Sequence, residues 1–232
     1  MKRPDKVFRL LSGAVWILLA MVVTACDRES ADDRSGLYGK WTDTEDGTVY
    51  RTLQLGDQTW LADNLNRGEM IDGAEDQQDN GIIEKYCYDN NPVLCDKYGG
   101  LYQWDEAMQY STRESAQGIC PEGWHIPSDS EWKILELFLG MSREDANEIL
   151  WRGIDQGVLI QTGGKTGFEA LRGGNRFLAG GFSQIGNTGY FWTSTRTEGR
   201  HAWRRGVNIN EDGIYRSENH KSFGFSVRCI RY

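Results

Sequence analysis

The sequence predicts an α+β domain, with two or three helices packed on small antiparallel sheets and a long, irregular, glycine-rich loop region. Three observations support this class. A strongly marked helix start lies at Ser128, glycine and scattered aromatic residues fill residues 153–189, and strand-like segments separated by turn residues lie at both ends of the domain. The roughly 200 residues that follow the N-terminal apolar segment are enough for a single domain with its own core.

The first 25 residues have the composition of an export signal. Basic residues precede an apolar run at residues 10–24, which closes with Val23-Thr24-Ala25-Cys26. Small residues directly before a cysteine are typical of the bacterial lipobox, so we expect residues 1–25 to be removed and Cys26 to be lipidated. An uncleaved helical anchor is the alternative, but the run is short for a membrane span and charged residues follow it at once.

Lipidation would hold the protein at the cell envelope, with the membrane as a partner through the N-terminal lipid. We expect the outer membrane, and the sequence leaves surface exposure and a periplasmic orientation both open. Residues 26–46 are polar and acidic with little periodicity, which predicts a flexible tether. Residues 47–232 would then form the folded domain.

Charge restricts the classes of partner. The chain has a net charge of −8, and its first 25 residues hold four basic residues and one acidic residue, so their removal brings the charge to −11. Nucleic acid is excluded as a partner, because its binding needs clustered lysine and arginine and the sequence has no such cluster. Anionic glycans are disfavoured as well.

The domain opens with a predicted hairpin, in which residues 49–55 and 59–61 flank the polar turn Gly56-Asp57-Gln58. A short helix is predicted at residues 104–110. The C-terminal part has the pattern of antiparallel strands, with a turn at residues 210–213. These strands are expected at residues 190–195, 201–209, 214–217 and 223–230.

The clearest helix start is Ser128-Asp129-Ser130-Glu131, which matches a capping box. This helix should end at Gly140. Its helical spacing directs four apolar side chains into the core, namely Trp132, Leu135, Phe138 and Leu139. A further helix is predicted from Ser142, and it would bury Ala146, Ile149 and Leu150.

Residues 153–189 contain three Gly-Gly pairs among polar and aromatic residues. Long loops inside a compact domain are usually functional. Glycine also lets a chain cross closely over itself, and the sequence leaves both explanations open.

Four cysteines follow Cys26, and an even set in an exported protein favours disulfide bonds. Of the three connectivities we favour Cys87 with Cys95, around the turn-forming residues 89–92, and Cys120 with Cys229. The second bond would tie the middle of the domain to its last strand. A zinc site with four thiolates is the alternative, which is weakened by irregular spacing and the lack of a Cys-x-x-Cys pair.

Residues suited to sugar binding occur in the C-terminal strands. Aromatic rings stack on the apolar face of a pyranose, and amides and carboxylates bond its hydroxyl groups. The candidates are Trp192, Trp203, Arg204, Asn208, Asn210, Glu211 and Asp212. Trp151 is a further surface candidate, and four other tryptophans are expected in the core, namely Trp60, Trp104, Trp124 and Trp132.

No resident cofactor or metal is expected. Asn210 and Asp212 are weak calcium candidates, because calcium takes about six to eight oxygen ligands and the sequence does not supply them all. A plain turn is the favoured role of residues 210–213. No catalytic residue is expected either, since the three histidines are far apart and neither His-x-x-x-His nor Gly-x-Ser-x-Gly occurs.

Several segments form a recurring pattern from about residue 46 to the end of the chain. They include Gln58-Thr59-Trp60-Leu61, Tyr98-Gly99-Gly100-Leu101, Cys120-Pro121-Glu122-Gly123-Trp124 and Gly224-Phe225-Ser226-Val227. In this order they resemble the Fibrobacter succinogenes major paralogous domain, which is found largely in exported and surface proteins. The resemblance implies a C-type-lectin-like fold, in a superfamily that also contains formylglycine-generating enzymes. Those enzymes use two cysteines near the C-terminal end, where this chain has only Cys229.

The sequence therefore predicts a lipid-anchored envelope protein whose lectin-like domain binds an extracellular ligand without catalysis. A glycan or cell-surface polymer is the favoured ligand. The alternative is a module for protein–protein contacts or envelope assembly, and an enzyme like those that generate formylglycine is less favoured.

Overall fold

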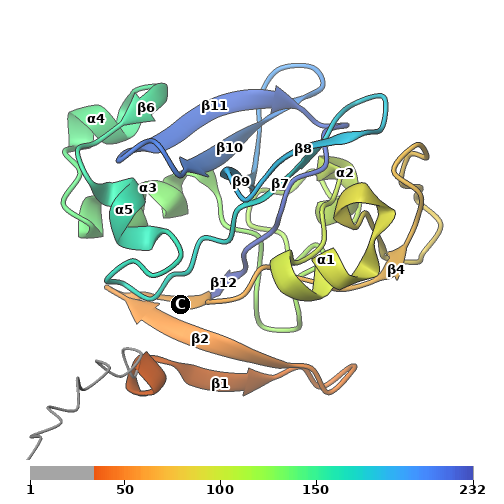
Figure 1. Ribbon diagram of the computed structural model, residues 1–232, viewed down its shortest axis with the longest axis horizontal. Coiled ribbons are helices and arrows are strands. Elements are labelled where there is room, and N and C mark those ends of the chain that lie inside the picture. Colours follow the sequence, from red (N-terminus) through yellow and green to blue (C-terminus); the bar gives the residue numbers. More distant parts are fainter. Residues whose placement is uncertain (1–33, 232) are drawn as a thin grey trace, which may run out of the picture. The chain divides into compact units, whose positions relative to one another are not determined.

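The computed structural model describes residues 34–231. The predicted signal peptide, the lipidation site Cys26 and the first part of the predicted tether lie outside the described residues. Within the described range the chain is α+β, as predicted, and has two main sheets, a small two-stranded sheet and short helices. Figure 1 shows the two main sheets at opposite ends of this unit. No helix of residues 34–231 is long and apolar enough to cross a membrane.

The larger sheet has six strands and is antiparallel except between β7 and β9. In spatial order its strands are β6 (Leu150–Arg152), β11 (Ile214–His220), β10 (His201–Asn208), β9 (Thr188–Arg196), β7 (Gly173–Arg176) and β8 (Phe182–Ile185). Strands β9, β10 and β11 confirm three of the four predicted C-terminal strands. Residues 210–213 connect β10 to β11, as expected.

The fourth predicted strand, residues 223–230, is wrong for most of its length. Only β12 (Ile230–Arg231) forms, and it pairs with the smaller main sheet. The residues before it make single bridges to separate neighbours, such as that of Phe225 with Tyr102. Their apolar pattern has another cause, because the segment crosses the core, where Val227 is completely buried.

The smaller main sheet has the order β1, β2, β3, β12. Its first three strands are β1 (Gly39–Thr42), β2 (Val49–Leu55) and β3 (Gln58–Leu61). Strands β2 and β3 confirm the predicted hairpin, with Gly56 at a φ of 58° in the turn. The parallel pair β4 (Glu69–Met70) and β5 (Glu84–Lys85) forms the two-stranded sheet.

Strand β1 corrects the predicted extent of the tether. It lies within residues 26–46 but pairs along its whole length with β2. The Trp41 ring contacts the rings of Tyr50 and Trp124 at centroid distances of 6.3 and 5.8 Å. Folded structure therefore begins before residue 47, because an aromatic side chain anchors this polar segment to the core.

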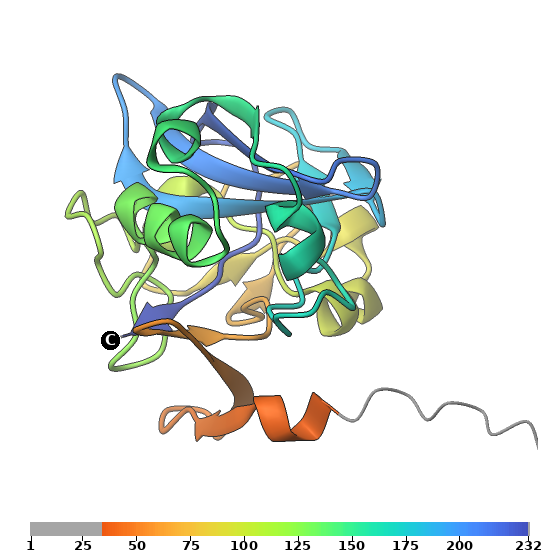
Figure 2. The same cartoon turned by 90° about the vertical axis from the view of Figure 1, so that its left-hand side faces the viewer.

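The helices are short. They are α1 (Pro92–Tyr98), α2 (Trp104–Ala107), α3 (Asp129–Phe138), α4 (Arg143–Asn147) and α5 (Gln156–Ile160), with 3-10 turns η1 (Arg34–Leu37) and η2 (Tyr88–Asn90). The predicted capping box at α3 is present, with Ser128 and Glu131 bonded reciprocally. Helix α2 is shorter than predicted, since Gln109 and Tyr110 adopt positive φ values of 47° and 56°. Figure 2 shows α3 and α5 between the two main sheets.

The predicted burial of apolar side chains is wrong at the C-terminal end of α3 and after the end of α4. Trp132 and Leu135 are buried as expected, but Phe138 is 55 % exposed and lies over Gly56 of the hairpin turn. Ile149 and Leu150 are 56 % and 52 % exposed. They are exposed because α4 ends at Asn147 and the chain then turns into β6, at the edge of the larger sheet.

The glycine-rich region is not one long loop, since α5, β7 and β8 form within it. Close crossing explains some of its glycines. Gly174 has a φ of 70°, and a Cβ atom there would lie 2.3 Å from the backbone oxygen of Ser183. Of the two explanations left open, close approach of backbones therefore holds at this position.

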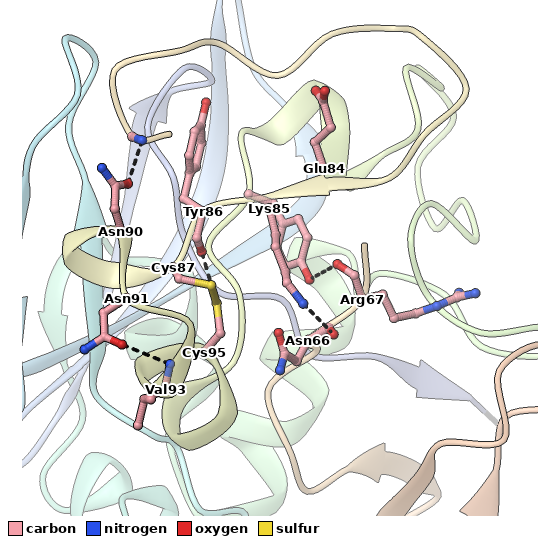
Figure 3. The surroundings of a disulfide bond; sticks show 12 residues. Asn66, Arg67, Glu84, Lys85, Tyr86, Cys87, Asn90, Asn91, Val93 and Cys95 are labelled. Atoms are coloured by element: carbon pink, nitrogen blue, oxygen red, sulfur yellow. Dashed lines mark hydrogen bonds between the residues drawn. A yellow bond between two sulfur atoms is a disulfide. The ribbon is translucent and has the colours of Figure 1, made fainter. Parts of the chain in front are cut away.

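Both favoured disulfides are present, Cys87–Cys95 and Cys120–Cys229. Figure 3 shows the surroundings of the first bond. Asn91 caps the start of α1 with its side chain, and Asn90 accepts a hydrogen bond of 2.8 Å from the backbone nitrogen of Gly73. The turn-forming residues inside the disulfide loop thus start a helix and anchor a neighbouring loop.

Candidate functional site

Strand β10 directs alternate side chains to opposite faces of the six-stranded sheet. Arg205 and Val207 point to the face covered by α3, where both are buried. Gly206 lies on the other face, directly opposite Tyr190 of β9 and Tyr215 of β11. This second face carries the candidate site.

On the α3 face, buried charges fix the helix to the sheet. Asp129 accepts hydrogen bonds from Arg205 (2.7 Å) and Arg216 (2.8 Å), and Glu136 accepts from Arg205 (2.6 Å) and Arg152 (2.7 Å). Burial would raise the pKa of Asp129, but the bonds from Arg216 and the charge of Arg205 outweigh it and hold that pKa well below its usual range. Each of these charged side chains has an oppositely charged partner within the layer, so this layer has a structural role.

The opposite face is hollowed by two adjoining cavities of about 290 and 230 Å³. They share Gln184, Tyr190 and Arg204, and together we call them the aromatic groove. The first cavity is also lined by Trp151, Thr188, Gly206, Asn208 and Tyr215. The second is also lined by Asn175, Phe177, Ser183, Asn219, Phe223 and Phe225. Their size approaches the lower end of small-molecule sites, about 300 Å³.

Aromatic rings follow the whole length of the aromatic groove. Trp151 packs edge-on against Tyr215, with ring centroids 5.0 Å apart. Tyr190 and Phe225 pack at 5.1 Å, and Phe223 and Phe177 continue the row beyond them. Apart from Phe225, which is buried, these rings offer stacking faces and, on the tyrosines, hydroxyl groups for a ligand.

Arg204 lies in the middle of this row. Its guanidinium carbon is 4.7 Å from the ring centroid of Tyr190 and 4.8 Å from that of Tyr215, distances typical of cation–π contacts. Burial lowers the pKa of Arg204 from its ordinary value, and the two tyrosines act in the opposite direction. Arginine nevertheless keeps its charge at neutral pH.

Arg204 makes no hydrogen bond or ion pair with any residue of the described range. Its Nε and Nη1 atoms are buried without a partner, while Nη2 remains accessible. The contrast with the other buried arginines is sharp, since each of those makes at least two hydrogen bonds. They are Arg152, Arg176, Arg205, Arg216 and Arg228. A buried, unpaired polar group calls for an explanation.

The groove also borders two strained positions. Gln184, which lines both cavities, and Leu150, which precedes Trp151, each have a φ of 68°. Positive φ is unusual for such side chains and tends to concentrate at binding sites. Gln184 is exposed, and its side chain makes no hydrogen bond with the described residues, so it is available to a ligand.

The structure separates the candidate residues predicted from the sequence. Arg204 and Asn208 line the aromatic groove. Trp192 is fully buried, donates a hydrogen bond of 2.8 Å to the backbone oxygen of Tyr102, and cannot meet a ligand at the surface. Trp203 lies on the α3 face, with the Arg216 guanidinium 3.6 Å from its ring centroid.

The turn residues Asn210, Glu211 and Asp212 are exposed and line neither cavity of the groove. Residues 34–231 contain no group of three or more histidine, cysteine, aspartate or glutamate side chains placed to hold a metal. The two weak calcium candidates, Asn210 and Asp212, are therefore not part of such a group. Within the turn, the Asn210 backbone nitrogen donates to the Asn208 side chain at 2.8 Å.

Sequence reasoning missed Tyr190, Tyr215, Gly206 and Gln184. A signal for three of them exists in the alternation of β9, β10 and β11, because residues two apart share a face. Applied to β10, the rule groups Gly206 with Arg204 and Asn208 and excludes Trp203. Gln184 has no such signal, since it lies in the short hairpin of β7 and β8, whose glycine-rich sequence lacks the apolar alternation of a strand.

Comparison with known proteins identifies the domain. Residues 53–231 match the family model of the Fibrobacter succinogenes major domain. A search of the curated proteins and a search of the solved structures found no match. Because the family model covers most of the chain, this protein belongs to the Fibrobacter succinogenes major domain family.

Proposed function

We propose that this protein is a lipid-anchored component of the cell envelope, and that its domain binds an extracellular ligand, a glycan or cell-surface polymer, in the aromatic groove without catalysis. The observation that carries the proposal is the groove itself, a row of aromatic rings around an arginine that has no hydrogen-bonding partner among residues 34–231. The anchor at Cys26 and a C-type-lectin-like relationship are parts of the same proposal and rest on the sequence pattern.

The lining supports binding of a sugar chain. Ring faces complement the apolar faces of pyranoses, and neutral amides and hydroxyls complement their hydroxyl groups. The neutral polar residues are Asn175, Ser183, Gln184, Thr188, Asn208 and Asn219. Among the described residues, neither lining contains histidine, aspartate, glutamate or lysine, so Ser183 has no such general base in the groove to activate it as a nucleophile. The lining therefore suits recognition better than bond cleavage.

A protein partner is the second candidate, and one observation favours it. Exposed apolar side chains gather at one end of the groove, where Ile149, Leu150, Trp151 and Ile154 are 56 %, 52 %, 38 % and 84 % exposed. Exposed apolar residues next to a groove are typical of interaction surfaces. The groove itself is more polar than an apolar protein-interaction surface, which favours the sugar ligand.

The proposal is tested by titrating the full chain, purified in detergent, against a panel of plant and host oligosaccharides. We expect saturable binding that Trp151→Ala weakens by about tenfold, since loss of a stacking ring removes on the order of 1 kcal/mol or more. Ile154→Ala is the matched control, because it removes a more exposed apolar side chain that lines neither cavity. Binding that resists Trp151→Ala but is lost in Trp203→Ala would place the site on the α3 face and contradict the proposal.

A further inference from the structure

We propose that the ligand of the aromatic groove carries a carboxylate that Arg204 binds, and that its chemical class is an acidic sugar such as a uronate. This inference rests on the proposed function and specifies it. The net charge of the chain disfavours anionic glycans, but the groove has its own electrostatic character.

Among the described residues, Arg204 is the only charged side chain that lines either cavity. No carboxylate of the described chain neutralises it, and the nearest groups are the rings of Tyr190, Tyr215 and Phe225. Ring faces attract a cation but accept no strong hydrogen bonds. A ligand carboxylate at Nη2 would supply the missing countercharge, and carboxylates are the group that guanidinium binds best.

The acidic residues of the chain do not prevent this. At physiological ionic strength, charges are screened over about 8 Å, and no acidic side chain of the described residues lines either cavity. A ligand carboxylate and the partly buried Arg204 guanidinium would interact at short range, where screening by salt is less effective. The groove itself carries the positive charge of Arg204, so it favours a negatively charged group on the ligand.

The position of the groove favours a sugar over a peptide. Around Arg204 the groove lies on the face of the sheet, where the backbone groups of β9, β10 and β11 are already paired with one another, and only its two ends reach the edge strands β6 and β8. A peptide strand binds chiefly through free backbone groups at a sheet edge. A sugar ring needs only side chains, which the groove provides as stacking rings, amides and hydroxyls.

The groove is preorganised for a ligand. Two tyrosine rings hold the Arg204 guanidinium in place, so little side-chain freedom is lost on binding. Because Gly206 has no side chain, the space between these two rings at the bottom of the groove stays free. A Cβ atom there would lie 3.2 Å from Nη1 of Arg204 and 3.2 Å from Cβ of Tyr215.

The experiment compares trigalacturonic acid with its methyl ester, which has the same rings but no charge. Titration calorimetry of the full chain in detergent should show the acid binding roughly 10- to 100-fold more tightly than the ester, the effect expected of a charge-assisted hydrogen bond. This comparison requires no variant, so it remains decisive even if a substitution prevents folding.

Three variants assign the preference to one side chain. Arg204→Gln should remove the preference for the acid, and Arg204→Lys should keep part of it because the charge remains. The matched control is Arg196→Gln, which removes the same charge from an exposed residue of β9 that lines neither cavity. It should leave the preference unchanged.

The outcomes separate this inference from the proposed function. Equal binding of acid and ester, both weakened by Trp151→Ala, would overturn the carboxylate inference and leave the groove as a sugar site. Binding of a tetraglutamate peptide in an Arg204-dependent way, without binding of the trimer, would overturn the sugar class. If the trimer fails and the wider panel also shows no groove-dependent binding, both proposals are contradicted.

Discussion

At the scale of single residues, Glu131 joins three parts of the chain. Its Oε1 lies 2.7 Å from Nε2 of His125, and its Oε2 accepts hydrogen bonds from the backbone of Ser128 (2.6 Å) and the hydroxyl of Ser115 (3.2 Å). Burial would raise the pKa of Glu131, but the hydrogen bonds from His125 and Ser128 outweigh it and lower the pKa from 4.5 to about 2. The ionised form is therefore favoured in the folded state.

This pKa shift predicts an acid-labile contribution to stability. Because the folded-state pKa of Glu131 is depressed, its contribution is present above pH 4.5 and is lost as the pH falls toward about 2. The shift corresponds to roughly 3 kcal/mol of unfolding free energy. Glu131→Gln, which can still form the capping box, should lower stability at pH 7 and flatten the fall between pH 5 and 2 in urea titrations. An unchanged pH slope would contradict this role.

Single residues also show where prediction from the sequence ends. Arg204 and Arg205 are adjacent and chemically identical, yet one lines the groove without a partner and the other bonds two buried carboxylates. Alternation along β10 places them on opposite faces, but it does not say which face α3 covers. Residue type predicts Trp192 and Trp203 as ligand-binding candidates, but tertiary packing places neither in the groove.

At the scale of elements, the predictions from capping and turn residues are confirmed, whereas several predictions of buried faces and strands are wrong. The capping box and the hairpin depend on neighbouring residues, and both formed as predicted. The strand predicted at residues 223–230 has the right apolar pattern, but a chain crossing the core has the same composition as a strand. Strands β7 and β8 are consecutive and pair as a hairpin, but the glycines in and between them obscure the strand pattern, so the sequence does not predict that Asn175, Ser183 and Gln184 line the groove.

The attachment of α3 to the sheet gives a second prediction. Asp129→Asn would remove the carboxylate that pairs with Arg216 and leave Arg205 with Glu136 alone, and breaking a buried ion pair typically costs about 3–5 kcal/mol. Lys133→Gln removes a more exposed partner of the same carboxylate and should cost about 1 kcal/mol or less. Urea denaturation of both variants measures the difference. Similar losses would show that the buried network does not fix the helix.

At the scale of the whole molecule, one disulfide joins distant parts of the chain and the other is local. Cys120 and Cys229 are 109 residues apart, whereas Cys87 and Cys95 are 8 apart. The cost of closing a loop in the unfolded chain grows with its length, so the long-range bond restricts the unfolded state more.

Paired serine substitutions should therefore have unequal effects. Replacing Cys120 and Cys229 should lower the unfolding free energy by about 5 kcal/mol, and replacing Cys87 and Cys95 by roughly half as much. Thermal unfolding under non-reducing conditions compares the two variants with the unaltered protein. A larger loss from the local pair would mean that its helix-capping loop stabilises the fold by other contacts.

The central claim is that the face of the six-stranded sheet opposite α3 binds the ligand. The most direct test is an NMR titration of isotope-labelled protein with trigalacturonic acid, following backbone amides and arginine side chains. Shifts concentrated at Gly206, Tyr190, Tyr215 and the Arg204 side chain are the predicted result. Shifts confined to the turn at residues 210–213, or to Trp203 and its neighbours on the α3 face, would contradict the account.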